Sequence, residues 1–334
     1  MFAKRPNKPR PKSQSRARTS AGKRAQNQAA RTPPPGWKDP LGQQQPLVSG
    51  RWLLGALLGV LGTALLCAYV TLCLLFYQGQ WQVVFHPSRS ITSTPASAGL
   101  LYDDVRFDYT GTGISQLAGW WIPAGTPTAH GGRTLLFFHD GKGSLSDTVS
   151  QLKTLHSFGI NILAFDYRGF GNSTNDHPSE QRVYEDADAA WTYLTDIRHL
   201  DPKSIVFYGT GLGATIAAEA ALRHRESPAL VLENPAPPAL SLIEADSRTH
   251  LIPIKWLFRD RFEIESKLQK LGAELHDPMR DFVKSGKPSS SSIIIRQETA
   301  PEKGPKLLIF MGPSPANDPN YTPAIQDLLN ALPG

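Results

Sequence analysis

The chain has 334 residues and a formal net charge of +6, and 40% of its residues are hydrophobic. Eleven of its 35 Lys and Arg lie within the first 50 positions, together with a single acid, Asp39, out of 29. The rest of the chain is therefore slightly acidic, and the basic character belongs to this first segment and not to the folded part.

Residues 1–50 form a basic arm that is rich in Pro, Gln, Ser and Ala and has no hydrophobic periodicity. Such a segment cannot bury enough apolar surface to offset the entropy lost on ordering, so we predict that it is disordered. Its charge fits a topology signal on a solvated tail, or contact with anionic lipid headgroups. It lacks the interleaved aromatic residues that nucleic-acid binding favours, so we expect no nucleic-acid partner.

The next segment, from Trp52 to Tyr77, carries no charged residue. As a helix rising about 1.5 Å per residue, it would reach roughly 37 Å and cross a hydrocarbon core of about 30 Å with some tilt. We therefore predict a transmembrane helix over residues 51–77 that contacts lipid through residues 52–77. A cleaved signal peptide is the alternative, but its apolar region would be only about 7–15 residues long.

Residues within and beside this span lead to three further predictions. Lys and Arg are retained on the cytoplasmic side of a span, so the cluster that ends at Arg51 predicts a cytoplasmic arm and an extracytoplasmic globular domain. Gly55 and Gly59 have the small-xxx-small spacing of helix pairs in membranes, which allows a homodimer. Both cysteines, Cys67 and Cys73, lie inside the span. The exported domain therefore has no disulfide, thiol nucleophile or thiolate metal site.

Beyond the span, apolar segments alternate with helical ones, as expected for a mostly parallel sheet with helices on both faces. The first two strands, Val105–Tyr109 and Leu117–Ile122, are expected to form an antiparallel hairpin. Further strands are expected at Thr134–His139, Asn161–Tyr167, Ser204–Tyr208, Ala229–Glu233 and Lys306–Met311. Helices are expected at Leu145–Phe158, Ser179–Thr195, Ala214–His224 and Pro323–Leu332.

The globular domain, residues 78–334, contains two segments that do not follow this alternation. Residues 236–285 are helical and partly amphipathic, over Leu251–Phe262 for example, and we expect them to form a cap over the carboxyl edge of the sheet. Residues 285–305 are rich in Ser, Pro and Lys around Ile293-Ile294-Ile295. We expect an exposed insertion there, with one short edge strand.

The most informative segment follows the strand that ends at Tyr208. The sequence G-T-G-L-G at residues 209–213 lies between a predicted strand and a predicted helix, where a G-x-S-x-G nucleophile elbow would place its serine. Here the central residue is Gly211, which has neither a hydroxyl nor a thiol. An elbow strains the backbone of its central residue, and glycine removes that strain. Gly211 is therefore the residue that such a turn favours when nucleophilic chemistry is not required.

Five other motifs occur in order along the chain. They are Phe85-His86-Pro87-Ser88-Arg89, F-D-Y-R-G-F-G-N-S at residues 165–173, Pro178-Ser179-Glu180 with Asp186-Ala187, Leu230-Val231-Leu232-Glu233, and Arg259-Asp260-Arg261-Phe262. Over residues 80–275 and 306–319 the chain resembles the α/β-hydrolase superfamily, and within it the membrane-anchored, serine-aminopeptidase-like branch. The resemblance implies an α/β-hydrolase fold with a helical cap.

Catalysis in that superfamily needs a serine nucleophile, a histidine base, an acid that holds the histidine, and backbone N–H donors for the oxyanion. The resemblance places Gly211 at the nucleophile position and Pro315 at the acid position, with Asp318 three residues too late. No histidine follows His276, and one strand and one helix of the family fold have no clear counterpart. We therefore expect a degenerate triad, no catalytic residue, and a protein that acts by binding a ligand or a partner.

The oxyanion loop departs from the family pattern as well. The family has His-Gly after its first central strand, whereas this chain has His139-Asp140-Gly141. A carboxylate there would oppose the stabilisation of an oxyanion, although the N–H of Leu212 could still be donated. We expect His139, Asp140, Gly211 and Leu212 to line the former cleft.

Two other functions remain open. The first is an active hydrolase of esters or amides, in which His139 or His250 activates water together with Asp140. The second is a structural membrane protein in which the hydrolase-like domain is only a spacer. No spacing of His, Asp and Glu predicts a metal or cofactor site.

Several polar residues near the motifs are given structural roles. Ser144 and Ser146 precede a helix and have the position of caps. Asp166, Arg168 and Ser173 are expected to hold the turn in which they lie, and Glu233 and Asp188 are interpreted as surface or turn carboxylates.

Overall fold

The computed structural model describes residues 49–125, 130, 132–244, 253–273, 293–297, 305–312 and 315–332. The chain divides into two compact units, Met1–Ala64 and Leu65–Gly334. The basic arm, His250 and most of the expected insertion lie outside the described residues.

A long apolar helix, α1, spans Gly50–Gly79. Within the described part of the chain it is the helix that is long and apolar enough to cross a membrane. Two of its hydroxyls are satisfied locally, because those of Thr63 and Thr71 donate to carbonyls one turn earlier at 2.9 and 2.8 Å. Phe76, near the end of α1, and Trp81, in the short helix α2 (Trp81–Val84), are half-buried against the core of the second unit.

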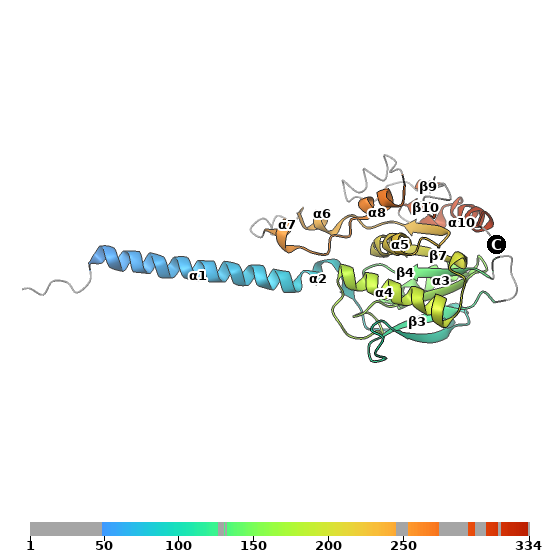
Figure 1. The fold of residues 1–334 in the computed structure, drawn as a ribbon, viewed down its shortest axis with the longest axis horizontal. Helices are drawn as coiled ribbons and strands as arrows, with labels where there is room; N and C mark the ends of the chain where they lie inside the picture. Colours follow the sequence, from blue (N-terminus) through green and yellow to red (C-terminus); the bar gives the residue numbers. More distant parts are fainter. Residues whose placement is uncertain are drawn as a thin grey trace, which may run out of the picture. The chain divides into compact units, whose positions relative to one another are not determined.

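An eight-stranded sheet forms the centre of the second unit (Figure 1). Its strand order is β2-β3-β6-β4-β7-β8-β10-β9. The neighbours β6, β4, β7, β8 and β10 are parallel, whereas β2, β3 and β9 pair antiparallel. The strands are β2 Asp103–Asp108, β3 Gln116–Ile122, β4 Thr134–Phe138, β6 Asn161–Phe165, β7 Ile205–Thr210, β8 Ala229–Glu233, β9 Ile293–Gln297 and β10 Lys306–Met311.

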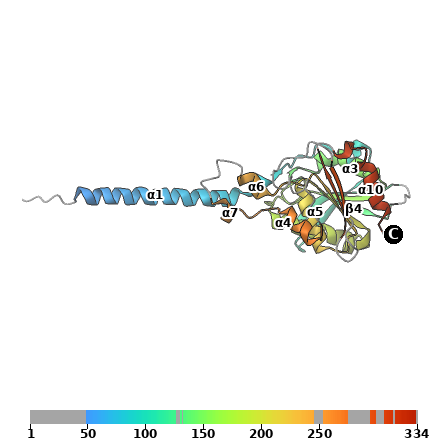
Figure 2. The ribbon, with the colours of Figure 1, turned by 90° about the horizontal axis from the view of Figure 1, so that it is seen from above.

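Helices cover both faces of this sheet, because its central strands are apolar on both sides. Figure 2 shows α3 and α10 on one side of β4 and α4 and α5 on the other, in agreement with the two separate clusters of buried side chains. The expected mostly parallel α/β fold is confirmed. The helices are α3 Val149–His156, α4 Glu180–Thr192, α5 Leu212–Arg223, α8 Ile264–Lys270 and α10 Tyr321–Asn330.

The described part of the expected cap contains two short helices, α6 (Ala239–Glu244) and α7 (Ile254–Leu257). The helical expectation over Leu251–Phe262 is wrong beyond Leu257. Phe258, Asp260 and Phe262 are all buried, at 2%, 6% and 0% exposure. Burial at every second residue is typical of an extended segment, whereas a helix buries every third or fourth residue. The prediction therefore assigned a helical period to a segment with a period of two.

Two pairings position the loops around the candidate site. The edge strand β9 pairs antiparallel with β10, so the expected short strand of the insertion lies at the edge of the sheet. A second, unexpected pairing joins β1 (His86–Pro87) in parallel to β5 (Lys142–Gly143). Because β5 follows the His139-Asp140-Gly141 segment, this small ladder fixes the loop that carries Asp140.

Candidate functional site

Gly211 is the only residue between β7, which ends at Thr210, and α5, which begins at Leu212. Its backbone has φ 57° and ψ −122°, a combination that strains a residue with a Cβ atom and suits glycine. Its N–H donates to the carbonyl of Glu233 at 3.0 Å, and its carbonyl accepts from the N–H of Ala236 at 2.9 Å. The chain therefore keeps the sharp strand–turn–helix geometry of a nucleophile elbow without the nucleophile.

The outer glycines of G-T-G-L-G are required by close packing. A Cβ atom on Gly209 would lie 2.2 Å from the carbonyl oxygen of Gly213. One on Gly213 would lie 2.2 Å from the carbonyl oxygen of Phe138. These contacts bring α5 directly against the end of β4, so the loop after β4 and the elbow share one space.

Asp140 fills that shared space with its carboxylate. Its Oδ1 atom accepts hydrogen bonds from the N–H of Leu212 and from the N–H of Gly141, both at 2.8 Å. A Cβ atom on Gly211 would lie 2.4 Å from the same oxygen. Leu212 begins a helix of 12 residues, and a helix N-terminus favours an anion. The Leu212 N–H that was expected to be available is thus already donated to an anion of the protein itself.

His139 is buried beneath this loop, with 1% of its surface exposed. Its Nδ1 lies 2.6 Å from the carbonyl oxygen of Asp140, and its ring packs against those of Tyr167 and Phe170. Burial lowers the pKa of His139 to about 4. The imidazole is therefore neutral near pH 7 and is held by the core.

The second nitrogen of His139, Nε2, faces Asp166. The two groups are 3.8 Å apart, and Nε2 has no hydrogen-bond partner. Burial raises the pKa of Asp166 to about 7. The hydrogen bond that its carboxylate accepts from the N–H of Leu145 at 2.9 Å acts in the opposite direction but is outweighed. Between the two pKa values both groups are neutral, so they do not form an ion pair. Asp166 instead holds the start of the segment that leads into α3.

The described residues after β10 include the two positions compared with the family's acid, Pro315 and Asp318. The amide of Asn234 closes the end of β10, donating to the carbonyl of Gly312 and accepting from its N–H, both at 2.8 Å. Pro315 is buried in a short 3-10 helix. Asp318 accepts from the N–H of Asn320 at 2.8 Å in the turn before α10, which is a local structural role.

The interpretation of Glu233 as a surface or turn carboxylate is wrong. Glu233 is 8% exposed and accepts hydrogen bonds from the Tyr208 hydroxyl and, at 2.7 Å, from the Gln151 amide. The Tyr208 hydroxyl is also 2.9 Å from that of Tyr321. Burial raises the pKa of Glu233. The sequence could not indicate this cluster, because Tyr208 and Tyr321 are 113 residues apart.

The other polar residues are found in structural positions. Ser144 caps the short helix before α3, and its hydroxyl accepts from the Ser146 N–H at 3.3 Å. The Arg168 side chain pairs with Asp186, and the Ser173 hydroxyl donates to the carbonyl of Asp166. Asp188 is partly exposed and pairs with Arg223 and His224. Within the described ranges, no group of three or more His, Cys, Asp and Glu is arranged to hold a metal ion.

Comparison with known proteins gives a consistent family. The family described as serine aminopeptidase, S33, matches residues 132–257. The chain is 31% identical over 165 residues to an uncharacterized protein of Mycobacterium tuberculosis, covering 49% of this chain and 55% of that protein. It is 30% identical over 182 residues to alpha/beta hydrolase domain-containing protein WAV2 of Arabidopsis thaliana, covering 52% and 54%. The chain thus spans about half the length of these two curated relatives.

Two further similarities are more restricted. Alpha/beta hydrolase domain-containing protein 17B of Xenopus laevis is 33% identical over 116 residues, which is 34% of this chain and 40% of that protein. Among solved structures, an alpha-beta hydrolase from Vibrio vulnificus superimposes with a TM-score of 0.42 and 24% identity, over 52% of this chain and 61% of that one.

Proposed function

The chain is a member of the α/β-hydrolase superfamily, and we propose that it is a catalytically inactive, membrane-anchored member that acts by binding. In this proposal the nucleophile position is held by Gly211, and the oxyanion donors are occupied by the protein's own carboxylate. The ligand or partner protein is recognised at the former cleft or on the cap.

The observation that carries the proposal is the position of Asp140. An oxyanion site stabilises negative charge that develops in the transition state, and it does so with N–H donors left free for the substrate. Here the N–H groups of Leu212 and Gly141 both donate to Asp140. A substrate oxyanion would have to displace a covalently attached carboxylate and then remain beside its charge.

An active hydrolase that uses His139 is the alternative function. A general base must reach the proton that it removes, directly or through one water. His139 is 1% exposed, its Nδ1 faces the carbonyl of Asp140, and its Nε2 faces Asp166. These contacts favour a structural role for His139 in the core over a role as general base, and they support the proposed inactivity.

The proposed lack of catalytic activity is tested on the full chain purified in detergent, with a fluorophosphonate serine-hydrolase probe and a short-chain p-nitrophenyl ester. We expect neither labelling nor turnover above background. Gly211→Ser should also be inactive, because it restores only the nucleophile. Labelling at a mapped serine, or turnover that is lost in His139→Ala, would show that the chain is an enzyme.

Membrane anchoring through α1 is a separate part of the proposal. The helix supports it by length and composition, and the basic arm favours a cytoplasmic N-terminus with an extracytoplasmic domain. The arm could contact anionic headgroups, and Gly55 and Gly59 could join two copies. Protease added from the cytoplasmic side should remove the arm and spare the domain, whereas digestion of the domain would reverse the orientation.

A further inference from the structure

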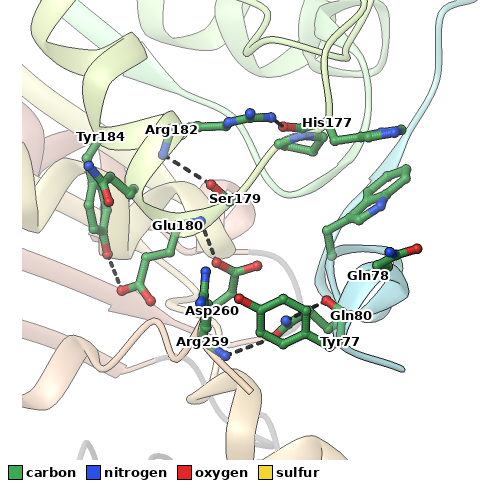
Figure 3. Close-up of a pocket in the computed structure, with 13 residues that line it drawn as sticks. Tyr77, Gln78, Gln80, His177, Ser179, Glu180, Arg182, Tyr184, Arg259 and Asp260 are labelled. Carbon is green, nitrogen blue, oxygen red and sulfur yellow. Dashed lines mark hydrogen bonds between the residues drawn. The ribbon is translucent and has the colours of Figure 1, made fainter. Parts of the chain in front are cut away.

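A cavity lies where α1 ends. The α1–α4 pocket has a volume of about 470 Å³. It is lined by residues between Tyr77 and Trp81, between His177 and Tyr184, and by Arg259 and Asp260. Figure 3 shows side chains from the end of α1, from the start of α4 and from the segment after α7 around this one space. All of these residues belong to the second unit.

The wall formed by α1 is fixed through Gln80, which is 6% exposed. Its amide nitrogen donates to the carbonyl of Tyr77 at 2.8 Å, and its amide oxygen accepts from the backbone N–H of Arg259 at 2.8 Å. The Arg259 guanidinium lies over the Tyr77 ring, 4.5 Å from its centre. Arg259 is thereby held at the end of the apolar helix.

The acidic residues of the pocket are already used by the protein. Asp260, 6% exposed, accepts from the N–H of Glu180 at 2.8 Å. Glu180 accepts from the Tyr184 hydroxyl at 2.6 Å and from the N–H of Arg261 at 2.7 Å. Both carboxylates are therefore held by hydrogen bonds from within the protein.

The basic residues retain donors for a ligand. Arg182 donates through Nη1 to Asp176 at 3.0 Å and to the His177 carbonyl at 2.6 Å, and its side chain is 42% exposed. No described residue accepts a hydrogen bond from the Arg259 guanidinium. A guanidinium carries five N–H donors, so several N–H groups of the two arginines remain without an acceptor among the described residues. Such groups favour a planar or tetrahedral anion as the ligand.

The position of the pocket along α1 indicates the source of such an anion. An uncharged run from Trp52 to Tyr77 exceeds the roughly 30 Å hydrocarbon core, so its end falls at the level of the lipid headgroups. Trp81, stacked on His177 at 4.7 Å, and Tyr77 are the aromatic types that favour this interface. Trp256, on α7 just before Arg259, is 92% exposed and fits the same environment.

We infer that the α1–α4 pocket binds the phosphodiester headgroup of a membrane phospholipid, with Arg182 and Arg259 as its charged donors. The binding ties the domain to the bilayer surface at a second point beside the helix. This inference rests on the proposed membrane anchoring and is independent of the proposed inactivity. Resistance of the chain to carbonate extraction from membranes tests the anchoring separately.

The headgroup site is tested by native mass spectrometry of the full chain released from micelles that contain dioleoyl phosphatidylglycerol. The wild-type chain should retain the phospholipid, and Arg259→Gln and Arg182→Gln should each retain it about tenfold more weakly, because each loses one charge-assisted contact. Arg259→Lys keeps the charge and should retain more than Arg259→Gln. Arg198→Gln is the matched control, because Arg198 also stacks on an aromatic ring, 4.2 Å from the centre of Trp121, beyond the opposite end of α4.

Three outcomes would overturn the inference. The first is equal phospholipid retention by wild type and both Gln variants. The second is equal retention of dioleoylglycerol, which has the same acyl chains and no phosphate, since binding would then come from the apolar helix surface. The third is binding of soluble glycerophosphoglycerol as tight as that of the lipid, which would assign the pocket to a soluble phosphodiester.

Discussion

The elbow and the α1–α4 pocket use polar groups in opposite ways. At the elbow, the Asp140 carboxylate accepts from the N–H groups of Leu212 and Gly141. At the α1–α4 pocket, the carboxylates are paired internally, while the guanidinium of Arg259 has no hydrogen-bond acceptor among the described residues. The N–H donors at the elbow are thus occupied by the protein's own side chain, whereas the guanidinium donors of Arg259 lie at the end of α1.

The difference teaches that the backbone of an elbow can be formed without a nucleophile at its centre, because the turn and the chemistry make separate demands. The elbow keeps its dihedral angles and its close-packed glycines because they join β7 to α5, whatever chemistry follows. The N–H groups that would serve a substrate cannot be left unpaired in a buried site without a cost of about 1–3 kcal/mol each. A side chain that accepts hydrogen bonds from them while no oxyanion is bound therefore stabilises the fold.

The largest expected effect is the pH dependence of stability caused by Asp166, which is buried beside His139. Its folded pKa is about 7, raised by burial from 3.8. The stability that its protonated form contributes is therefore present below about pH 4 and lost as the pH rises through about 7. Asp166→Asn keeps an acceptor for the Leu145 N–H without a charge. The free energy of unfolding of wild type should fall relative to this variant by up to about 4 kcal/mol between pH 4 and 8.

This prediction is measured by urea unfolding of the full chain in mild detergent at several pH values. His139, with its pKa lowered to about 4, contributes a change of the opposite sign between about pH 4 and 6.5. Since it is present in both proteins, it largely cancels in the difference. Asp188→Asn is the control: hydrogen bonds from His224 and Arg223 outweigh partial burial and lower the pKa of Asp188. Wild type should lose stability relative to that variant only as the pH falls below about 4, so the two profiles should run nearly parallel from about pH 5 to 8. Parallel profiles for wild type and Asp166→Asn would contradict the assignment.

Most of the fold could be predicted because its strands are short apolar runs with one possible environment. β4 and β8 are buried at every position, and such runs are typical of the middle of a parallel sheet. The Phe258–Phe262 segment was misread because its two apolar residues, Phe258 and Phe262, are four positions apart, which also fits helical spacing. The β1–β5 ladder could not be predicted, since two residues pairing with two residues leave no periodic pattern.

The candidate site could be predicted only in part, because the direction of its side chains is not encoded in local sequence patterns. The sequence placed Gly211 at the elbow and a carboxylate beside it, because both follow recognisable strands. It could not show that Asp140 would turn towards Leu212, 72 residues later, and take the N–H that had been expected to be free. Side-chain direction depends on the loop that β1 and β5 hold, and that loop is a product of the tertiary structure.

A smaller effect is expected from removing the carboxylate that closes the elbow. Asp140→Ala leaves the N–H groups of Leu212 and Gly141 without their acceptor, which should lower the free energy of unfolding by about 2 kcal/mol. Asp140→Asn can still accept through its amide oxygen and should lose less. Both variants are compared with wild type by urea unfolding at pH 7. Equal stability of Asp140→Ala and wild type would mean that water replaces the carboxylate at no cost, and the elbow would then resemble an open site.

The smallest effect is a coupling between Gly211 and Asp140. In the wild-type background, Gly211→Ala places a Cβ atom at a φ of 57° and 2.4 Å from Asp140 Oδ1. In an Asp140→Gly background only the backbone strain remains. The two changes should therefore be non-additive by about 1 kcal/mol in a double-mutant cycle of unfolding free energies. If they add, Asp140 moves aside without resistance when the elbow residue grows. A side chain could then be accommodated at residue 211 without any change at position 140, and the Asp140 carboxylate would not be a steric barrier at the elbow.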